Sequence, residues 1–571
     1  MKNTQIAEIF YEIADLMDMQ SVQWKPRAYR NGARAIADAD DVEKTYAEGG
    51  RKALLEIPGI GQALADKIIE YIETGKIKEY EKLTKKLPSG VHEMMHIMGL
   101  GPKKAWRLYK ELHIKSVAEL EKAAKAGKLQ KLSGFGPKSE QEILKGIATV
   151  KRGQSRMLLG TALPLASEIV GRLKKLKEVR MIDIAGSLRR MQESIGDIDV
   201  LVVSANAEKI MDAFTTMPNV ERVLAKGPTK SAVVLKEGTN ADCRVVKPES
   251  FGAALQYFTG NKEHNVAVRQ LAIKKGFKLN EYGVFKGTKY IAGKTEEDVY
   301  KVLGLRWIPP ELRQNTGEID AAKNNTLPNL IPYDAIRGDL HTHSAWSDGT
   351  NTTEEMVRAA IRLGYDYIAL TDHSKSEYVA HGMDEKRLVK YIAEVNKLKK
   401  KYASQIHVLA GSEVSIMGDG KLDYANKYLE QLDWVVASVH SRFKQARDEM
   451  TKRILHALSN EHVNALGHPT GKLINTREPY EVDMNRVFAA AKANKVALEI
   501  NASPERLDLK DTHIRAAREL GAKLVINSDA HHENQLKAMR FGIAQARRGW
   551  AEEKDVVNAL PWKKFEKYIS K

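Results

Sequence analysis

The chain has 571 residues and a mass of 63.9 kDa, more than one ordinary hydrophobic core organises, so we expect roughly three to five domains. A hydrophobic share of 43% and a charged share of 29% are typical of globular proteins, and no apolar run approaches the roughly 18 residues of a membrane span. A single cysteine, Cys243, excludes an internal disulfide and a cysteine zinc finger. These features predict a cytoplasmic protein with no membrane partner.

The net charge of +17 is unevenly distributed along the chain. Residues 101–200 contain 21 Lys/Arg and 11 Asp/Glu and so contribute +10, whereas residues 1–50 are net acidic. A local basic surface favours a polyanion such as nucleic acid as the partner. A solvated, lysine-rich surface would show the same excess, so charge alone leaves both interpretations open.

Residues 1–150 are predicted to be almost entirely α-helical, because their apolar residues recur with a helical period. Three segments there share an apolar-Gly-apolar-Gly turn before a helical stretch: IPGIGQALADKIIEYI (57–72), MGLGPKKAWRLYKEL (98–112) and SGFGPKSEQEILKGI (133–147). Such a turn lets backbone amides approach a DNA phosphate, and the next helix adds the positive end of its dipole. One copy could be an ordinary helix–helix turn, but three copies favour sequence-independent DNA binding. The predicted contacts are Gly59, Gly61, Gly99, Gly101, Lys103, Gly134, Gly136 and Lys138.

From about residue 180 the pattern changes to short apolar strands with helices between them, which predicts an α/β sheet domain. In GSLRRMQESIGDIDVLVV (186–203), Asp197 and Asp199 alternate on a strand and therefore point to one face. With Asp242 on a neighbouring strand, they could hold a pair of Mg²⁺ or Mn²⁺ ions about 4 Å apart. Gly186, Ser187 and Arg190 could hold the phosphates of a nucleotide. Asp-x-Asp alone would usually be a solvated strand edge, but this combination is the nucleotidyltransferase pattern.

The same segment, followed by YFTGNKEHN (257–265), resembles the family X DNA polymerases, the group of DNA polymerase beta, over residues 1 to about 315. The resemblance implies that Asp242 helps to activate the primer 3′-hydroxyl. It implies nucleotide contacts from Gly186, Ser187, Arg190, Gly196, Tyr257, Phe258, Gly260 and Asn265, and a template contact from Arg269. Tyr257 and Phe258 could instead be core residues. Asn261 and Lys262 depart from the vertebrate enzyme, which puts its base-pair selectivity in doubt here.

The resemblance extends to the first hairpin, where Lys67 occupies the position of the family's Schiff-base lysine for 5′-deoxyribose phosphate removal. A lysine beside apolar residues and other cations can retain enough neutral amine to attack a sugar aldehyde. Tyr29 and Lys25 match supporting positions that contact DNA. Ala63 replaces a second family lysine, which weakens the prediction, and an exposed helical lysine is the plain alternative.

Residues 305–335 are rich in Pro and Asn and show no clean period, which predicts a linker. From residue 336 strands alternate with helices, as in a parallel barrel, whose carboxyl-terminal strand ends meet at one face. Twelve of the 16 histidines occur at or after position 341. Ligand-type side chains follow nearly every predicted strand: His341, His343, Asp348, His373, Glu413, His440, His468, Asp529 and His531. One such histidine would be a core residue, but nine buried polar groups predict a cluster of metal ions.

Mixed imidazole and carboxylate ligands suit Zn²⁺ or Mn²⁺, with Fe²⁺ as a further option. The motifs HxH…D, TDH, GSE, SVH, GHP and SDAH together resemble the PHP (polymerase and histidinol phosphatase) domain over about 336–571. All nine ligand positions of that family are filled, which implies an active domain with about three ions. In polymerase fusions the domain is associated with 3′→5′ exonuclease, AP endonuclease and 3′-phosphatase activities.

The sequence therefore predicts a multidomain protein. Its parts are a helical DNA-binding domain with possible lyase function (1–85), helix-hairpin-helix fingers (86–150), a nucleotidyltransferase palm (151–260) and a thumb (261–318), followed by a linker (319–335) and a distorted (β/α)7 PHP barrel (336–571). We expect a monomeric gap-filling polymerase of base excision repair that binds gapped or primed DNA and dNTPs. Its barrel would process 3′ ends.

Three alternatives remain at this stage. The chain could be a phosphoesterase whose polymerase half only holds DNA, although the intact Asp197, Asp199 and Asp242 set disfavours this. It could be a DNA end-binding scaffold with structural metals. A small-molecule phosphatase fits least, given the three hairpins and the basic middle.

Overall fold

The structure is a computed structural model that describes residues 2–19, 25–38, 42–57, 59–84, 91, 94, 100, 102–132, 134–136, 139–141, 143, 144, 147 and 156–570. The chain divides into two compact units, Met1–Ser155 and Arg156–Lys571. Within the described ranges, none of the helices combines the length and apolar character needed to traverse a lipid bilayer.

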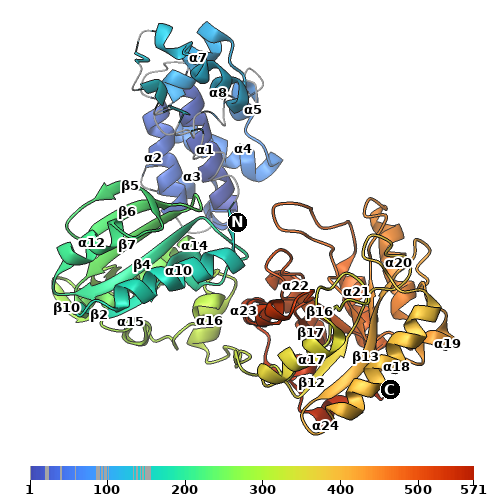
Figure 1. Cartoon of the computed structure of the whole chain (residues 1–571). Coiled ribbons are helices and arrows are strands. Elements are labelled where there is room, and N and C mark those ends of the chain that lie inside the picture. The colour runs from blue at the N-terminus through green and yellow to red at the C-terminus, as the bar shows by residue number, and fades with distance from the viewer. Residues whose placement is uncertain are drawn as a thin grey trace. The chain divides into compact units, whose positions relative to one another are not determined.

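Every element described in the first unit is a helix, as the periodicity predicted (Figure 1). Its elements are α1 (Lys2–Met19), α2 (Lys25–Asp38), α3 (Val42–Leu55), α4 (Gln62–Thr74), α5 (Lys78–Thr84), α7 (Pro102–Leu112), α8 (Val117–Lys125) and η1 (Leu129–Lys131). Their apolar stripes form two separate cores, one around Phe10 and Ile68 and the other around Leu108 and Phe135. Two cores indicate two small helical domains in this unit.

The second unit opens with a five-stranded sheet in the order β2-β4-β7-β6-β5. Its elements are β1 (Met157–Leu158), α10 (Leu159–Lys174), β2 (Val179–Ile184), α11 (Gly186–Arg189), β3 (Ser194–Ile195), β4 (Asp197–Ser204), α12 (Ala207–Thr215), β5 (Val220–Lys226), β6 (Lys230–Leu235), β7 (Asn240–Val246), η2 (Pro248–Ser250) and α13 (Phe251–Thr259). Strand β4 alternates by parity: Ile198, Val200 and Val202 pack in the core with α10 and α12, whereas Leu201 and Val203 pack with α13. Asp197 and Asp199 lie four and two residues before Leu201, so their side chains point to the same face of the sheet as Leu201, the face covered by α13.

A small domain follows, with α14 (Lys262–Lys274), an antiparallel sheet of β8 (Lys278–Asn280), β9 (Gly283–Lys286) and β10 (Lys289–Ala292), and α15 (Glu296–Val302). The segment predicted as a linker contains η3 (Pro310–Leu312) and α16 (Glu318–Lys323). It is packed rather than extended, because Leu312 and Ile331 are fully buried and the Ile331 amide donates to Ala551 O at 3.0 Å. Specific burial of this kind leaves no periodic signal in a sequence.

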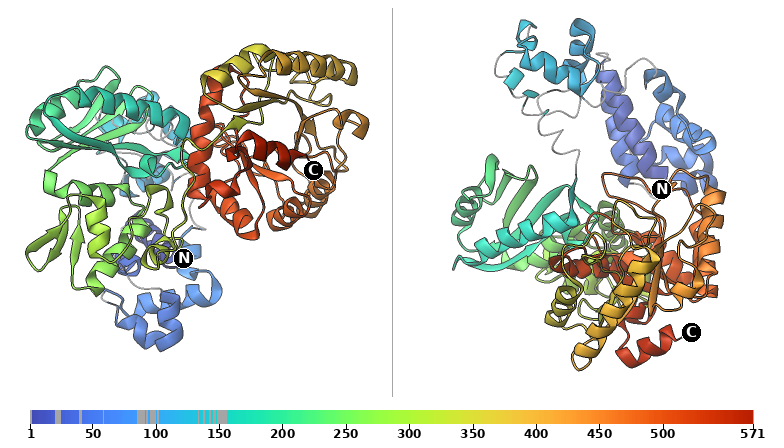
Figure 2. Two further views of the ribbon diagram at one scale, coloured as in Figure 1. Left: turned by 90° about the horizontal axis from the view of Figure 1, so that it is seen from below. Right: turned by 45° about the vertical axis from the view of Figure 1, so that its right-hand side comes forward.

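The remainder is a barrel of seven parallel strands in sequence order, confirming the predicted barrel. Its elements are β11 (Gly338–Asp339), α17 (Thr353–Arg362), β12 (Tyr367–Leu370), α18 (Glu385–Lys401), β13 (His407–Ser415), α19 (Asn426–Leu429), β14 (Trp434–Ser438), α20 (Arg447–Leu458), β15 (Ala465–Leu466), α21 (Met484–Ala493), β16 (Ala497–Asn501), α22 (Asp511–Leu520), β17 (Leu524–Asn527), η4 (Glu533–Ala538), α23 (Met539–Arg548), η5 (Glu553–Asp555), η6 (Val557–Ala559) and α24 (Trp562–Ile569). The left view of Figure 2 shows the helices surrounding the strands. A parallel bridge between Thr342 and Ala530 joins the first and last strands, so the barrel is nearly closed.

Strand alternation sorts the barrel interior into layers. Apolar residues such as Trp434 and Val525 fill the amino-terminal end, which Phe565 of α24 closes by stacking on Tyr367 with 4.4 Å between ring centroids. Further along β12, β14 and β17, buried residues on the same face are polar, as at Thr371, Ser438 and Asn527. The predicted ligands His373, His440 and Asp529 follow two residues later, so one face of each of these strands changes from core to site along its length.

Candidate active sites

The three predicted catalytic carboxylates come together on the palm sheet. Asp199 of β4 lies directly opposite Asp242 of β7 in the parallel register, and Asp197 is two residues away on the same face. Burial, followed by the negative charges of Asp197 and Asp242, raises the pKa of Asp199 to about 7. Lys230 contacts Asp242 at 2.8 Å and offsets only part of this charge. Concentrated negative charge of this kind suits a divalent cation.

The palm carboxylates are more widely spaced than the barrel ligands. Among the described residues, groups of three or more potential ligands with all atoms within 4.8 Å of one another occur only in the barrel. Magnesium is commonly held by one or two carboxylates together with substrate phosphates. The palm geometry therefore fits an ion that is completed by a bound triphosphate.

The glycine before Ser187 is required by its neighbour. Gly186 has a φ of 65°, and a Cβ at this position would lie 2.4 Å from Asp199 Oδ2. Ala185 donates its amide to the Asp199 carbonyl at 2.8 Å, which brings the turn beside the catalytic strand. Ser187 follows in α11 and is half-buried. The structure thus places the predicted phosphate-binding turn against the carboxylates.

Arg190 closes this turn, and it also touches the YFTGN segment. Its guanidinium donates to the Thr259 carbonyl and lies beside Gly260, whose added Cβ would be 3.1 Å from Arg190 Nη1. Burial and the charge of Arg548 lower the pKa of Arg190 to about 10. Arg190 is therefore held, still cationic at neutral pH, where the resemblance predicts a triphosphate.

The other predicted nucleotide contacts lie on or near α13. The rings of Tyr257 and Phe258 meet edge to face with centroids 5.1 Å apart. Asn265 donates to the Tyr257 carbonyl at 2.6 Å, which connects α14 to this segment. Gly196 is exposed at the start of β4, with Arg156 nearby, and Arg269 is exposed on α14.

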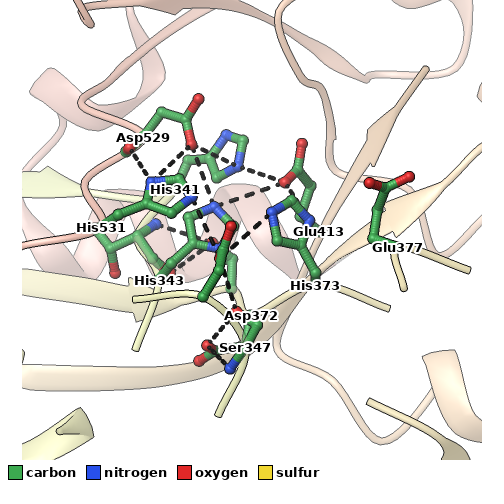
Figure 3. Close-up of polar contacts among 12 residues, drawn as sticks. His341, His343, Ser347, Asp372, His373, Glu377, Glu413, Asp529 and His531 are labelled. Carbon is green, nitrogen blue, oxygen red and sulfur yellow. Dashed lines mark hydrogen bonds and ion pairs between the residues drawn. The ribbon is translucent and has the colours of Figure 1, made fainter. Parts of the chain in front are cut away.

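The barrel ligands form three overlapping groups at its carboxyl-terminal end. The groups are His343, Asp348, His373 and His531; then His341, His343 and Asp529; and then His373, Glu413 and His440. Figure 3 shows the crowded rings of His341, His343, His373 and His531 between the carboxylates of Glu413 and Asp529. His468 belongs to none of these groups, but its Nε2 lies 2.8 Å from Glu413 Oε1. Eight of the nine predicted ligands therefore form candidate ion sites directly, and the ninth contacts a member.

Buried nitrogen atoms test whether these groups fit metal ions. Both ring nitrogens of His343, Nε2 of His341 and Nδ1 of His373 are buried and form no well-aligned hydrogen bond, although carboxylate oxygens of Glu413 and Asp529 lie 3.0 to 3.3 Å from three of them. Leaving such atoms unpaired is costly, so a ligand is expected to satisfy them. Burial and the charges of His531 and His373 lower the pKa of His343 to about 3, which keeps its lone pair available. The site fits a cluster of divalent ions.

The carboxylates in the cluster are strongly ionised. Burial raises the pKa of Asp348, but hydrogen bonding to His531 and the charges of nearby imidazoles outweigh burial and lower this pKa to about 2. Burial lowers the pKa of His531, but hydrogen bonding to Asp348 and the negative charge of Asp529 outweigh burial and raise this pKa to about 9. The surrounding carboxylates likewise raise the pKa of His341 and His373, which favours protons on these imidazoles and on that of His531. A divalent ion would replace those protons.

Several functional residues escaped the sequence reasoning because they lie inside strands or in loops without a motif. Glu499 of β16 is fully buried, contacts His341 Nδ1 at 2.7 Å and accepts the His468 amide at 2.6 Å. Asp372 accepts hydrogen bonds from Ser344 and Ser347, which hold the loop after the HxH motif. The only signal for Glu499 was an acidic residue within the apolar strand VALEIN. Such second-layer carboxylates orient ligating histidines.

A cavity of about 310 Å³ opens onto this cluster. Besides the ligands, its lining includes Phe443, Arg477 and Arg506. Arg506 contacts Asp529 at 3.3 Å, and the Arg477 guanidinium lies 4.2 Å from the Phe443 ring centroid. Cations and an aromatic ring at the mouth suit a phosphate joined to a planar group.

In the first unit, Lys67 lines a cavity of about 680 Å³ together with Lys25, Tyr29 and Ala63. Glu79, which the sequence reasoning missed, forms an ion pair with Lys67 and accepts a hydrogen bond from Tyr29 at 2.8 Å. Burial acts upward on the carboxyl, but hydrogen bonding to Lys67 and Tyr29 outweighs it and holds the pKa of Glu79 below its usual range. The predicted lyase residues therefore meet in one pocket with an additional carboxylate.

The structure describes part of the predicted hairpin set. Gly59 has a φ of 96°, and Gly61 is the residue before α4, where its carbonyl accepts the Leu64 amide. Gly134 has a φ of 82° and Gly136 is exposed. Lys103 lies in α7. Gly99, Gly101 and Lys138 lie outside the described residues.

Comparison with protein families assigns four stretches of the chain. Four family models match: Helix-hairpin-helix domain (1–77), SAM-like Helix-hairpin-helix tandem (91–149), DNA polymerase beta thumb (254–314) and PHP domain (339–503). These matches confirm the predicted fold class.

Relatives extend the match to the whole length. The DNA polymerase/3′-5′ exonuclease PolX of Bacillus subtilis is 36% identical over 576 residues, covering 100% of both chains. DNA polymerase lambda of Rattus norvegicus is 24% identical over 344 residues, covering 54% of this chain and 56% of that one. A probable phosphatase of Thermoanaerobacter sp. is 32% identical over 205 residues, covering 34% of this chain and 78% of its own. Full-length identity at this level, with both sets of predicted site residues assembled, shows that the chain belongs to the family X DNA polymerases that carry a C-terminal PHP domain.

Proposed function

We propose that this chain is a DNA polymerase and 3′-5′ exonuclease that fills short gaps during base excision repair. The observation that supports it most is the full-length alignment with a polymerase/exonuclease, in a chain with carboxylates opposite one another on the palm sheet and three groups of potential metal ligands in the barrel.

In the palm, the Asp242 carboxylate would accept the proton of the primer 3′-hydroxyl, and Asp197 and Asp199 would be ion ligands; the pairing of Asp199 with Asp242 in the strand register supports this. Ser187 and Arg190 would hold the triphosphate, and Tyr257, Phe258 and Gly260 would bracket its sugar. Asn265 would meet the incoming base and Arg269 the template. This arrangement would orient the 3′-oxygen, the α-phosphorus and the leaving pyrophosphate in line.

In the barrel, the nine ligand residues would hold the ions while Arg506 and Arg477 bind the scissile phosphate. Hydrolysis adds water across the last phosphodiester and releases a nucleoside 5′-monophosphate with a new 3′-hydroxyl. Divalent cations, when bound at both centres, supply Lewis acidity to the phosphorus under attack. That new 3′-hydroxyl is the group the palm extends.

We assign Mg²⁺ or Mn²⁺ to the palm and a cluster of three Zn²⁺ or Mn²⁺ ions to the barrel. Metal analysis of the purified chain should find ions that survive gel filtration, and His341→Ala should lower their number. Ions retained in full by that variant would contradict the assignment. Removal of all metal should abolish synthesis and hydrolysis, while DNA binding by the helical domains persists.

One gapped duplex tested with three proteins separates the two activities. Wild type should extend the primer and trim a 3′ mismatch. Asp199→Ala should lose extension by at least about 1,000-fold while trimming persists, and His341→Ala should show the reverse. Wild type without extension under Mg²⁺ or Mn²⁺ would support the alternative of a phosphoesterase that only holds DNA. Binding without either activity would support the scaffold alternative.

The helical domains are proposed to bind DNA through its backbone, at Gly59, Gly61, Gly99, Gly101, Lys103, Gly134, Gly136 and Lys138. Such binding should weaken steeply with salt and depend little on base sequence. A salt titration of a fluorescent duplex measures the slope. The chain is proposed to act as a monomer, which light scattering would check.

We also propose 5′-deoxyribose phosphate lyase activity at Lys67, with Tyr29 and Lys25 binding the 5′-phosphate. The pocket in which these side chains meet supports the proposal. Borohydride should trap a covalent DNA adduct on wild type but not on Lys67→Ala. Absence of a wild-type adduct would refute it. AP endonuclease activity of the barrel should be assayed on the same DNA while the strand at its AP site is still intact.

A further inference from the structure

One loop of the barrel presents two large apolar side chains almost completely to solvent. Tyr378 is 85% exposed and Val379 is 93% exposed, more than any other large apolar side chain among the described residues. The next most exposed are Ile273 at 64% and Tyr282 at 62%. Isolated apolar side chains on a surface are common, but two adjacent ones at the tip of a loop indicate a contact with something outside the chain.

The base of this loop, residues 374–383, is held firmly while its tip projects. The Met383 amide donates to the His373 carbonyl at 2.8 Å, and Ser374 Oγ donates to Asp423 at 2.9 Å. Arg387 reaches across from α18 and donates to the His381 carbonyl at 2.7 Å. These bonds fix where Tyr378 and Val379 stand. A fixed tip can offer a binding surface at a small entropic cost.

The tip stands at the mouth of the metal site. The loop starts directly after the ligand His373, and Val379 and Ala380 line the cavity of about 310 Å³ that opens onto the cluster. Glu377, at the foot of the tip, lies beside the ligands in Figure 3 and is 3.8 Å from His440 Nδ1. Apolar surface therefore continues from the cavity wall out to the tip.

The same mouth contains an arginine with one unpaired nitrogen. Arg506 Nε lies 3.3 Å from Asp529, but its Nη1 is buried with no hydrogen-bond partner, and the residue lines the cavity. Arg477 lies on the same wall over the Phe443 ring. A phosphate would satisfy these guanidinium groups, so the mouth pairs a phosphate site with an apolar surface. A nucleotide has this combination of charge and planar ring.

We propose that Tyr378 and Val379 form a stacking surface for an unpaired base at the 3′ end of a DNA strand, while the neighbouring phosphodiester lies at the barrel cluster. This inference rests on the exonuclease activity proposed above. A base within a duplex has both faces covered by its neighbours, whereas a frayed or mispaired terminal base exposes a face to stack. The tip therefore favours hydrolysis of unpaired 3′ ends and leaves paired ends to the palm.

The test uses a primer whose last two bases are mispaired, beside a fully paired primer of the same sequence. Tyr378→Ala should raise KM on the mispaired end roughly 5- to 150-fold, the usual range for loss of one stacked base. Tyr378→Phe should retain wild-type values because its ring remains. On the paired end the two variants should differ little, so the preference for mispaired ends should shrink in Tyr378→Ala.

A binding measurement separates stacking from a general loss of activity. A 3′-terminal 2-aminopurine, joined through a phosphorothioate that resists hydrolysis, should lose fluorescence on binding to wild type and to Tyr378→Phe. Tyr378→Ala should leave it bright while retaining the same metal content. Tyr282→Ala is the matched control, since that exposed tyrosine lies in the turn between β8 and β9 and should behave as wild type.

The outcomes are distinguishable. Wild type without 3′-5′ hydrolysis would refute the exonuclease itself. Hydrolysis by wild type with an unchanged KM and unchanged quenching in Tyr378→Ala would refute the stacking surface alone. If Tyr378→Ala instead altered only the molecular mass in light scattering, the tip would be a contact between two copies and the proposal would be overturned.

Discussion

At the scale of single residues, the two centres depend on atoms that admit almost no substitution. In the palm, the absent side chain of Gly186 leaves the space that the Asp199 carboxylate occupies. In the barrel, Glu499 contributes no predicted ligand atom yet contacts both His341 and the His468 backbone. Both positions act through a neighbour that carries the chemistry.

We expect Gly186→Ala to abolish synthesis and spare hydrolysis. The new methyl group would approach Asp199 Oδ2 to 2.4 Å and would be strained at a φ of 65°. Displacing a catalytic group by about 1 Å can cost roughly 100-fold in rate, so extension should fall at least that far. Primer extension measures this, and exonuclease assays on the same preparation provide the control. Extension within tenfold of wild type would contradict the steric argument.

Glu499→Gln should weaken metal binding in the barrel by roughly 10- to 100-fold, the usual effect of losing a partner of a ligating histidine. The glutamine side chain carries no negative charge beside His341 Nδ1. Its NH2 group would also face the backbone N–H of His468, and two donors cannot form a hydrogen bond. Competition with a chelator, followed by metal analysis, gives the affinity. Synthesis by the palm should be unchanged. Equal metal retention in both proteins would show that Glu499 only fills space.

At the scale of secondary-structure elements, one buried carboxylate connects the phosphate-binding turn to the small domain. Glu296 of α15 receives hydrogen bonds from Arg189 of α11 at 2.8 and 2.9 Å and from Arg313 at 2.7 Å. Burial acts upward on the carboxyl, but these guanidinium groups prevail and lower the pKa of Glu296 to about 2. The turn that carries Ser187 and Arg190 is therefore anchored by a charge.

The ion pairs of Glu296 should make the free energy of unfolding depend on pH. Because the folded pKa of Glu296 lies below the unfolded value of about 4.5, its contribution is complete above pH 4.5 and is lost as pH falls toward 2. The shift corresponds to about 3 kcal/mol as an order of magnitude. Denaturant unfolding of wild type and Glu296→Gln between pH 2 and 7 should show a difference that shrinks over this window. A constant difference would contradict the assignment.

At the scale of the whole second unit, the barrel packs directly against the palm. Phe541 of α23 and Leu507 belong to the same apolar core as α10 and β4. Glu193, in the loop between Arg190 and Asp197, is held by Lys472 and Gln545 of the barrel, each at 2.8 Å. The loop that joins two parts of the palm site is thus supported from the barrel.

Arg548 makes the nearest of these contacts to the nucleotide site. It donates to the Arg190 carbonyl at 3.3 Å and is held by an ion pair with Asp511. Arg548→Ala should raise the KM for dNTP roughly tenfold with little change in trimming, the size expected for one charged hydrogen bond. Arg540→Ala, an exposed position on the same helix, is the control for steady-state extension assays. An unchanged KM would show that the contact does not position the turn.

The sequence by itself determined the fold class and the family of this chain, and it predicted the residues of both centres. His373, Glu413, His440 and Asp529 lie at even spacings from inward apolar residues of their own strands, and such alternation is a local property that a sequence displays. The same holds for Asp197 and Asp199, and for the helical period of residues 1–150. These features could be predicted because each depends on neighbours a few positions away.

Only the tertiary structure decided which of these residues meet and what supports them. Glu499 and Glu79 were missed because a carboxylate inside an apolar strand or on a short helix has no motif, and its role arises from a partner distant in sequence. The same reason applies to the packed segment around Ile331, to Arg548 beside Arg190, and to the place of His468 outside the three ligand groups. Side-chain contacts between distant segments depend on how elements pack, and packing is a property of the whole fold.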